Sequence, residues 1–410
     1  MSSKTNIHIK PLGILDLLAF KNLIPLRRKM LMSGKLGVYD PYPPMNRLAD
    51  ALHPALQYME VKEAIPLTDD IVSYTLIPDM ARGTKACAYF KAGQYVSIKL
   101  EIDGLPISRP VTISSSPKEA LDGYYTIAVK KTEAPFASAY IHTHWKPGSK
   151  VTVSGPEGNF VYEPLRDAPA VIGVAGGCGF TPFRSMARAI ADGTENFSLV
   201  ILYGSRRECD IAYKDEFDEL SLKSNGKLRA VHVLSDETSV PESMETGFIT
   251  ADLIRKYAPA EPYSLFLCGP PVMYDFLRKE LDSLGLEKKY VRRELYGERK
   301  NVQDLPDYSG SEKNAAFNLT VVVRGKERTV NASAKESLLT ALERGGVAAP
   351  ASCRSGECGF CRSRLIMGDV FIPEDTDGRR AADRKFGYVH PCASYPISDV
   401  VLEIPEPAVD

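Results

Sequence analysis

Four cysteines near the C-terminus are spaced as a set of metal ligands. Cys353, Cys358 and Cys361 form a C-x4-C-x2-C pattern, and Cys392 follows after thirty intervening residues. This spacing occurs around 2Fe-2S clusters, in which four thiolates hold two irons and two sulfides. Structural zinc usually takes a C-x2-C pair at both ends of its site, and this stretch contains one such pair. The cysteines therefore predict a 2Fe-2S cluster.

The residues between these cysteines suit a chain that wraps closely around a cluster. Gly356 and Gly359 allow positive φ angles and a close approach of the backbone. Amide groups aimed at the sulfurs would then tune the reduction potential. Residues 353–361, together with Cys392, closely resemble plant-type ferredoxins. That resemblance implies an α+β ferredoxin domain of the β-grasp type at residues 315–410.

Three arginines lie beside the thiolates, namely Arg354, Arg362 and Arg364. They could contact a partner protein, or they could balance the negative charge of the cluster. The sequence leaves both roles open.

A glycine-rich turn follows the apolar run 170–174 and leads into a predicted helix. It contains Gly176, Gly177, Gly179, Thr181 and Pro182. Glycines let the backbone close on a pyrophosphate, and the helix N-terminus supplies amide donors and positive potential. A second turn, made by Cys268, Gly269 and Pro270, follows the apolar run 264–267. Because both runs would end at the same edge of a parallel sheet, the two turns predict a dinucleotide cleft.

The elements around these turns fall into two patterns. From about 167 to 297, apolar runs alternate with helical stretches, which predicts an α/β domain whose parallel sheet is covered on both faces. From about 55 to 166, short alternating runs separated by turn residues predict an antiparallel barrel or sandwich, interrupted by a helix that starts near Ser138. The polar stretch 298–314 is typical of a linker.

The two turns resemble the NAD(P)H domain of the ferredoxin-NADP reductase superfamily, which carries G-G-x-G-x-x-P and C-G-P-x motifs in this order. The resemblance implies that residues 176–182 hold the nucleotide diphosphate. It also implies that Cys268, Gly269 and Pro270 border the nicotinamide.

Ser205, Arg206 and Arg207 end the next strand, where this superfamily binds the adenosine ribose. The two guanidinium groups could clamp a 2′-phosphate, whereas Glu208 could bind a 2′-hydroxyl. NADPH and NADH both remain open.

Three short stretches in the first predicted sheet resemble the flavin domain of the same superfamily, which is an antiparallel β-barrel. The stretches are residues 90–95, 109–115 and 155–160. The flavin-binding residues that they imply are Arg109, Pro110, Val111, Thr112, Ser138, Gly158 and Phe160. Arg109 would pair with the flavin phosphate, Thr112 would place its hydroxyl near the reactive flavin nitrogen, and Ser138 would cap the phosphate-binding helix.

Two departures from the superfamily pattern affect the flavin. Val111 replaces the usual tyrosine beside the isoalloxazine, and residues 135–138 stand where a glycine often opens the helix turn. Some reductases with a C-terminal ferredoxin domain use FMN. The helix at Ser138 and the loop that ends in Phe160 favour FAD.

Glu294 matches a superfamily glutamate near the junction of flavin and nicotinamide, although an ordinary charge at a strand end would look the same. With Thr112 and Cys268 it completes the residues expected to take part in the chemistry. The sequence shows no His/Asp/Ser constellation, and none is needed, because the cofactors carry the reaction.

Composition narrows the class of protein. The 410 residues carry 51 basic and 52 acidic side chains, a formal net charge of -1, which gives no basis for nucleic-acid binding. The longest weakly polar stretch, residues 168–180, is too short to span a bilayer, and the first residues do not form a secretory signal. We therefore expect a cytoplasmic protein.

The combined resemblance covers residues 55–408 and implies an iron-sulfur flavoprotein reductase. The expected domains are a basic N-terminal arm at 1–54, a flavin barrel at 55–166, an NAD(P)H domain at 167–297, a linker at 298–314 and a ferredoxin domain at 315–410. The arm could cap the next domain, or it could bind an acidic partner or a membrane surface.

In this interpretation NAD(P)H delivers two electrons to the flavin. The 2Fe-2S cluster then passes them singly to a protein acceptor, such as an oxygenase or another metalloprotein. Two alternatives remain: a non-enzymatic redox relay or sensor module of a larger complex, and a membrane-docked subunit that reduces quinones. Membrane contact is possible but is not favoured.

Overall fold

The structure is a computed structural model that describes residues 13–33, 43–131, 136–310 and 312–405. It divides the chain into two compact units, Met1–Ala49 and Asp50–Asp410. The first unit holds α1 (Ile14–Ser33), and α2 (Pro44–Leu52) spans the boundary. In α1, Phe20, Ile24 and Met32 are exposed. None of the helices in the described ranges combines the length and hydrophobicity that a membrane crossing requires. Both interpretations of the N-terminal arm therefore stay predictions.

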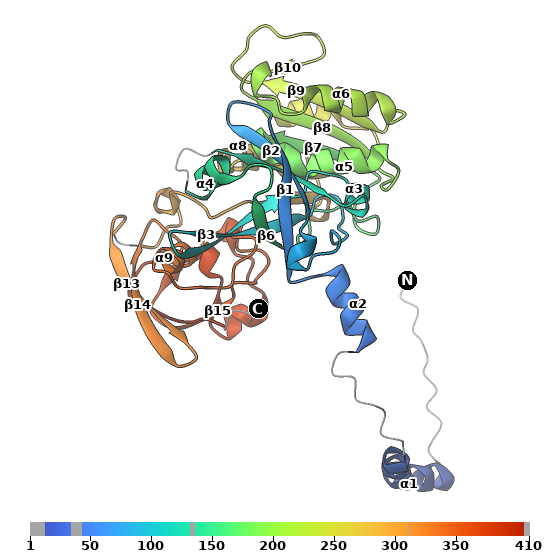
Figure 1. Ribbon diagram of the computed structural model, residues 1–410, viewed down its shortest axis with the longest axis vertical. Coiled ribbons are helices and arrows are strands. Elements are labelled where there is room, and N and C mark those ends of the chain that lie inside the picture. Colours follow the sequence, from blue (N-terminus) through green and yellow to red (C-terminus); the bar gives the residue numbers. More distant parts are fainter. Residues whose placement is uncertain (1–12, 34–42, 132–135, 311, 406–410) are drawn as a thin grey trace. The chain divides into compact units, whose positions relative to one another are not determined.

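The second unit begins with an antiparallel six-stranded sheet, which confirms the predicted barrel-type flavin fold (Figure 1). Its strands are β1 (Leu56–Pro66), β2 (Ile71–Pro78), β3 (Tyr95–Ile102), β4 (Leu105–Thr112), β5 (Tyr125–Lys130) and β6 (Lys150–Ser154), in the order β4-β3-β6-β1-β2-β5. Two helices accompany it, α3 (Pro117–Leu121) and α4 (Ala137–His144). Alternate residues such as Met59 and Val61 point into one core, as the period-two pattern predicts.

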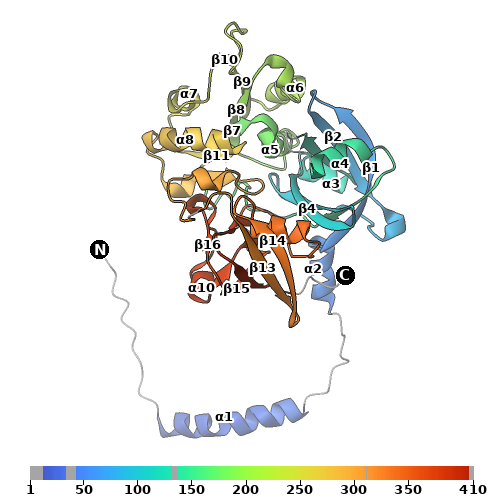
Figure 2. The ribbon, with the colours of Figure 1, turned by 90° about the vertical axis from the view of Figure 1, so that its left-hand side faces the viewer.

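A parallel sheet follows, with the order β10-β9-β8-β7-β11-β12. Its strands are β7 (Ala170–Gly176), β8 (Ser198–Ser205), β9 (Leu228–Leu234), β10 (Glu245–Thr246), β11 (Tyr263–Cys268) and β12 (Val291–Glu294). The helices are α5 (Thr181–Ala191), α6 (Lys214–Lys223), α7 (Ala251–Tyr257) and α8 (Pro271–Ser283) (Figure 2). Successive residues of β8 enter opposite cores, Ile201 with α5 and α6 and Leu202 with α7 and α8. The sheet is therefore covered on both faces, as predicted.

The C-terminal part is a mixed five-stranded sheet with the order β14-β13-β19-β15-β17. Its strands are β13 (Ala316–Val323), β14 (Lys326–Ser333), β15 (Ser363–Met367), β17 (Tyr388–Val389) and β19 (Val400–Glu403), and β16 (Val370–Phe371) pairs with β18 (Tyr395–Pro396) beside it. The helices are α9 (Leu338–Arg344) and α10 (Ala381–Lys385). Leu338 and Leu342 of α9 pack on Leu319 and Leu402 of the sheet, which confirms the α+β prediction.

Short 3-10 turns join these elements. They are η1 (Met80–Arg82), η2 (Gly177–Phe180), η3 (Glu208–Asp210), η4 (Lys288–Tyr290), η5 (Val302–Asp304), η6 (Glu374–Thr376) and η7 (Pro391–Ala393).

The polar stretch 298–314 packs against the C-terminal part of the chain. Val302 is fully buried against Phe371 and Tyr395. Gln303 is also buried, and its side-chain nitrogen donates to the carbonyl of Ala334 at 2.7 Å. Val302, with Leu305 and Tyr308 packed in the same cluster, thus anchors a stretch whose composition is typical of a free linker.

Candidate active site

The predicted flavin and nicotinamide residues meet around one cavity of about 500 Å³. From the barrel and α4 it is lined by Arg109, Pro110, Val111, Thr112 and Ser138. From the parallel sheet it is lined by Gly176, Gly177, Gly179, Thr181, Cys268, Gly269 and Pro270. Residues of the barrel and α4 and residues of the parallel-sheet domain therefore form walls of the same cavity.

The two glycine-rich turns touch each other, and this contact explains why glycine stands there. A Cβ added to Gly179 would lie 1.9 Å from the carbonyl oxygen of Cys268. A Cβ on Gly176 would lie 2.7 Å from the sulfur of Met273. Gly177 adopts a positive φ of 52°, and α5 then starts at Thr181 with Pro182 in its first turn. The backbone amides at this helix start fit a diphosphate.

The structure corrects the predicted role of Ser138 as a helix cap. The cap residue of α4 is Phe136, and the helix itself begins at Ala137. The carbonyl of Phe136 already accepts the first helical hydrogen bond, from the amide of Tyr140 at 3.1 Å. Ser138 therefore lies inside the first turn of α4, where the helix orients its backbone amide.

Thr112 and Glu294 are connected through a residue for which the sequence predicted no role. The hydroxyl groups of Thr112 and Tyr296 form a short hydrogen bond, and Tyr296 lines the cavity. Glu294 ends β12 and is 5% exposed, and burial raises the pKa of its carboxyl well above the ordinary value. This burial disfavours the charged form of the carboxyl. The sequence could have pointed to Tyr296 through its position two residues after Glu294, because side chains two positions apart in an extended chain point to the same side.

Cys268 lies in the cavity wall as a neutral thiol. The residue is fully buried, and this burial raises the pKa of its thiol well above the ordinary value. It therefore contributes a small apolar surface to the cavity and does not supply a thiolate nucleophile at neutral pH.

Arg109 has a second partner besides the cavity that it lines. One of its terminal nitrogens donates to the carbonyl of Ser108 at 2.7 Å and lies 3.4 Å from a carboxylate oxygen of Glu343 in α9. A guanidinium group has five N–H donors, so hydrogen atoms remain for an anion in the cavity. This cationic wall, together with the apolar side chains of Val111 and Ile141, fits the phosphate and ring of a flavin.

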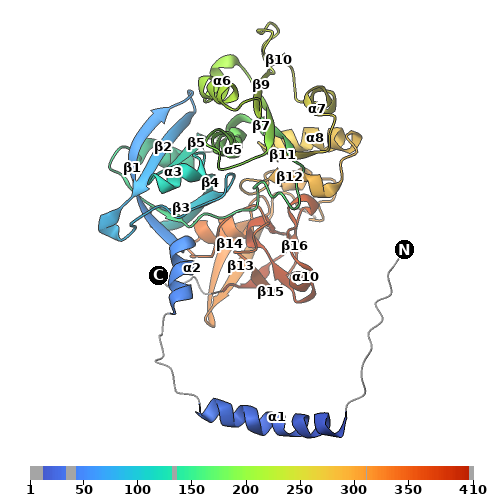
Figure 3. The ribbon, with the colours of Figure 1, turned by 90° about the vertical axis from the view of Figure 1, so that its right-hand side faces the viewer.

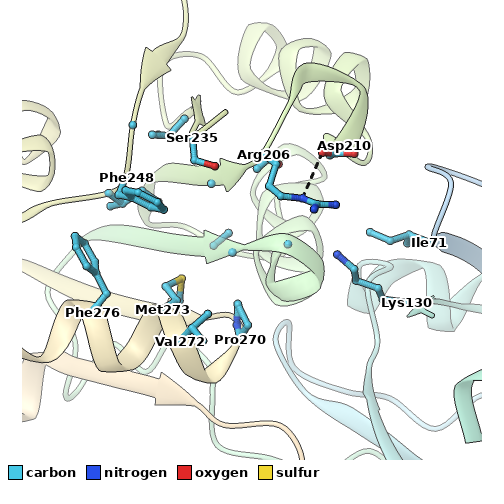
Figure 4. Close-up of a pocket in the computed structure, with 18 of the residues that line it drawn as sticks. Ile71, Lys130, Arg206, Asp210, Ser235, Phe248, Pro270, Val272, Met273 and Phe276 are labelled. Carbon is cyan, nitrogen blue, oxygen red and sulfur yellow. Dashed lines mark ion pairs between the residues drawn. The ribbon is translucent and has the colours of Figure 1, made fainter. Parts of the chain in front are cut away.

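A second cavity of about 440 Å³ continues from the first and shares Lys130, Gly176, Gly177 and Pro270 with it. Figure 4 shows Phe248 and Phe276 at one end and Arg206 at the other. Ser205 and Arg206 line this cavity, as expected for the ribose end of a dinucleotide. The shared wall makes the two cavities a continuous path from the nucleotide to the flavin site.

Five predicted site residues lie outside the linings of both cavities: Gly158, Phe160, Pro182, Arg207 and Glu294. Gly158 has a φ of 105°, and a Cβ there would lie 2.9 Å from the ring of Tyr95. Phe160 packs on Phe183 and Phe266 beneath the sheet. Phe160 thus packs against the parallel-sheet domain, whereas Gly158 packs against a residue of the barrel.

The four cysteines of the C-terminal part converge on one point. The sulfurs of Cys361 and Cys392 are 3.4 Å apart. Three backbone amides also point at sulfurs. The amide of Cys358 lies 3.4 Å from the sulfur of Cys353, and the amide of Phe360 lies 3.4 Å from the sulfur of Cys358. The amide of Gly356 lies 3.2 Å from the sulfur of Cys392.

Backbone amides aimed at sulfur stabilise thiolates, which is the form in which cysteines hold a cluster. The amide donors therefore fit a 2Fe-2S cluster.

The cysteine loop is held directly against the flavin barrel. Ser352, the residue before Cys353, hydrogen-bonds the hydroxyls of Tyr95 at 3.2 Å and Ser97 at 3.3 Å. It also donates to the carboxylate of Glu157 in a short hydrogen bond. The start of β3, where Tyr95 pairs with the cavity-lining Thr112, thus contacts the residue adjacent to a predicted cluster ligand.

Of the three arginines beside the thiolates, Arg354 is excluded from partner contact by its burial. Its side chain is 3% exposed and forms ion pairs with Glu343 at 2.5 Å and with Glu298. Arg362 and Arg364 remain exposed.

Comparison with known proteins identifies all three parts of the chain. Residues 60–162 match the oxidoreductase FAD-binding domain, residues 174–279 match the oxidoreductase NAD-binding domain, and residues 321–396 match the 2Fe-2S iron-sulfur cluster binding domain.

The related proteins are components of oxygenase systems. The glycine betaine monooxygenase reductase subunit of Chromohalobacter salexigens is 29% identical over 327 residues, which cover 77% of this chain and 87% of that protein. The 3-ketosteroid-9-alpha-monooxygenase ferredoxin reductase component of Mycolicibacterium smegmatis is 26% identical over 353 residues, or 84% and 95% of the two chains.

Among solved structures, phthalate dioxygenase reductase shares the fold, with a TM-score of 0.59 and 23% identity, and the match covers 85% of this chain and 98% of that one. The three matched domains stand in the order that the sequence predicted. The chain belongs to the iron-sulfur flavoprotein reductases of the ferredoxin-NADP reductase superfamily, and it transfers electrons from NAD(P)H through FAD to a C-terminal 2Fe-2S ferredoxin domain.

Proposed function

We propose that this chain is the reductase component of an oxygenase system. The observation that carries the proposal is the direct contact between the flavin barrel and the cysteine loop, through Ser352, Tyr95 and Ser97. This contact provides a short route within one polypeptide from the flavin cavity to a surface from which a protein can take electrons. The relatives, which are named as reductase subunits of monooxygenases, support an oxygenase as that protein.

The chain's residues position the reactants and exclude water. When bound, FAD accepts a hydride from NAD(P)H and releases its electrons one at a time. The glycine-rich turns at Gly176 and Gly179 bring the nucleotide diphosphate to the start of α5. The pair Thr112 and Tyr296 offers hydroxyl donors at the cavity wall, and burial raises the pKa of the nearby Glu294 carboxyl well above its ordinary value, which disfavours an anion there. These groups orient the cofactors and supply no acid or base of their own.

Four cysteines are proposed to hold the cluster, and Cys358 is the exposed member of the set. Cys353, Cys361 and Cys392 are buried. A cluster held in this way would be closest to solvent at Cys358. We therefore propose that electrons leave at this edge.

The test begins with an anaerobic titration of the full chain, loaded with FAD and cluster, with NADH or NADPH. Bleaching of the flavin followed by the EPR signal of a reduced 2Fe-2S cluster is the expected result. The reduced chain is then used to purify, from its source cell, the protein that reoxidises the cluster without oxygen present. An acceptor with an oxygen-activating iron centre supports the proposal. Reoxidation by membrane quinones, or by a protein without oxygenase activity, contradicts it.

A further inference from the structure

One exposed face runs along the chain from the cysteine loop. Phe360, Arg362, Arg364 and Ile366 are exposed, while Cys361 and Ser363 between them are buried. This alternation is that of a strand with one face in solvent. Because Phe360 lies between Cys358 and Cys361, the face begins at the exposed edge of the proposed cluster site.

The second side of this face comes from α10 and β17. Arg364 lies opposite Tyr388 in the antiparallel pair of β15 and β17. The guanidinium of Arg362 lies 4.9 Å from the ring centre of Tyr388. Figures 2 and 3 both show α10 beside β15. Arg384, Lys385 and Phe386, at the end of α10, are exposed as well. We call the set Phe360, Arg362, Arg364, Arg384, Lys385 and Phe386 the cluster-edge surface.

The cluster-edge surface is basic although the whole chain is nearly neutral. Residues 362–364 and 377–388 contain six basic and two acidic side chains, against a net charge of -1 for all 410 residues. The two acids point inward: Asp383 is 5% exposed and pairs with Arg362 at 3.2 Å, and Asp377 is 16% exposed and pairs with Arg379 and Arg384. The outward charge is therefore positive.

The exposed composition is that of a protein interface. Arginine and aromatic side chains are enriched in the central parts of protein interfaces. Positive charge around them attracts a negatively charged protein and raises its rate of encounter.

We propose that the cluster-edge surface is the docking site for the acidic face of the protein electron acceptor. The acceptor would place its own redox centre beside Phe360 and Cys358, with acidic side chains against Arg364, Arg384 and Lys385. This inference rests on the proposed function, because it assumes that electrons leave the chain through the cluster.

The test uses two haem proteins of opposite charge as acceptors, acidic cytochrome b5 and basic cytochrome c. The double variant Arg364→Glu/Lys385→Glu reverses two charges of the cluster-edge surface. The matched control is Lys326→Glu on β14, an exposed residue in the same domain at the opposite edge of the five-stranded sheet. The second-order rate constant for reduction and the Kd of the complex are measured for each acceptor at low ionic strength.

We expect the double variant to reduce cytochrome b5 at least about tenfold more slowly than the wild type, and to bind it at least about tenfold more weakly. Its reduction of cytochrome c is expected to be unchanged or faster, and Lys326→Glu is expected to behave as the wild type. Added salt should slow the reduction of cytochrome b5 by the wild type.

The inference is overturned if the double variant and Lys326→Glu slow the reduction of cytochrome b5 equally, or if neither variant slows this reduction. It is also overturned if salt has no effect on the wild type. NADH-dependent reduction of the cluster, followed by EPR without any acceptor, must stay normal in the double variant. Loss of that signal in the wild type itself would instead contradict the proposed function.

Discussion

Arg354 of the cysteine loop and Glu343 of α9 form an ion pair at 2.5 Å, with side chains that are 3% and 10% exposed. The same carboxylate lies 3.4 Å from Arg109 of the flavin barrel. Glu343 thus connects the residue after a predicted cluster ligand with the residue predicted to bind the flavin phosphate. Since Glu298 also pairs with Arg354, the buried charges are nearly balanced. This network positions the cysteine loop against the barrel.

Replacing Glu343 should loosen this arrangement. Glu343→Gln leaves Arg354 with Glu298 as its remaining anionic partner. We expect the free energy of unfolding to fall by about 2 kcal/mol, the usual worth of hydrogen bonds to a buried charge. Denaturant unfolding followed by cluster absorbance measures the change, and stopped-flow mixing with NADH should show slower cluster reduction. Glu327→Gln, at an exposed position on β14, is the control and should change the free energy by less than about 0.5 kcal/mol. Equal effects of the two variants would contradict the positioning role.

The cysteine assignment predicts a separation of two activities. Cys358→Ser or Cys392→Ser should abolish the EPR signal of the reduced cluster, because serine is a poor substitute for a thiolate ligand. Reduction of ferricyanide by NADH, which requires only the flavin, should stay within about twofold of the wild-type rate. Cys209→Ser is the control, since Cys209 is exposed on the parallel-sheet domain. An intact EPR signal in either ligand variant would show that the cysteine is not a ligand.

The buried carboxyl of Glu294 predicts a pH dependence of stability. Burial raises its pKa in the folded chain well above 4.5, whereas in the unfolded chain it ionises near that value. The contribution of Glu294 to the free energy of unfolding is therefore fully present below pH 4.5, and it is lost as the pH rises through the pKa of the folded chain. The slope is at most about 1.4 kcal/mol per pH unit.

Glu294→Gln should remove this contribution. We expect its free energy of unfolding to fall less than that of the wild type between pH 5 and pH 8, a range chosen to span roughly neutral conditions. Urea titrations at a series of pH values make the comparison, and Glu261→Gln at an exposed position serves as the control. Parallel pH profiles for the wild type and Glu294→Gln would mean that this carboxyl is ionised in the folded chain.

The charges at the outer end of the nucleotide cavity predict a preference for NADH. Asp210 lies 3.9 Å from Arg206 and 3.5 Å from Arg207, so both guanidinium groups already face a carboxylate. A 2′-phosphate would have to compete with that carboxylate. We expect kcat/KM for NADH to exceed kcat/KM for NADPH about fivefold. Asp210→Asn should lower this NADH/NADPH ratio about threefold, a small change because exposed ion pairs are weak. Asp215→Asn, at an exposed position on α6, is the control. An unchanged ratio in Asp210→Asn would show that these pairs do not govern the choice.

Much of the site could be predicted from the sequence because its chemistry depends on local spacing. The four cysteines and the glycine-rich turns act through residues a few positions apart, and the sequence displays such spacing directly. Tyr296 and Glu343 were missed for the opposite reason. Each acts on a residue more than a hundred positions away, Thr112 for Tyr296 and Arg109 for Glu343.

Local signals also misled where packing decided the outcome. Ser138 is a residue type that often caps helices, yet the cap of α4 is Phe136, so the serine lies two positions too late. The sequence left the role of Arg354 open, and packing decided it: with a φ of 56° the side chain is buried against the carboxylates of Glu298 and Glu343.

The amino-acid sequence by itself determined the cofactor set and the order of the three domains, because ligand type and motif spacing are properties of short segments. The tertiary structure alone decided which charges are buried, which face beside the cluster stays open to a partner, and how the cysteine loop meets the barrel. Those features arise from contacts between distant segments. Burial sets the energy of each charge, and a side chain is buried only after those segments have packed together.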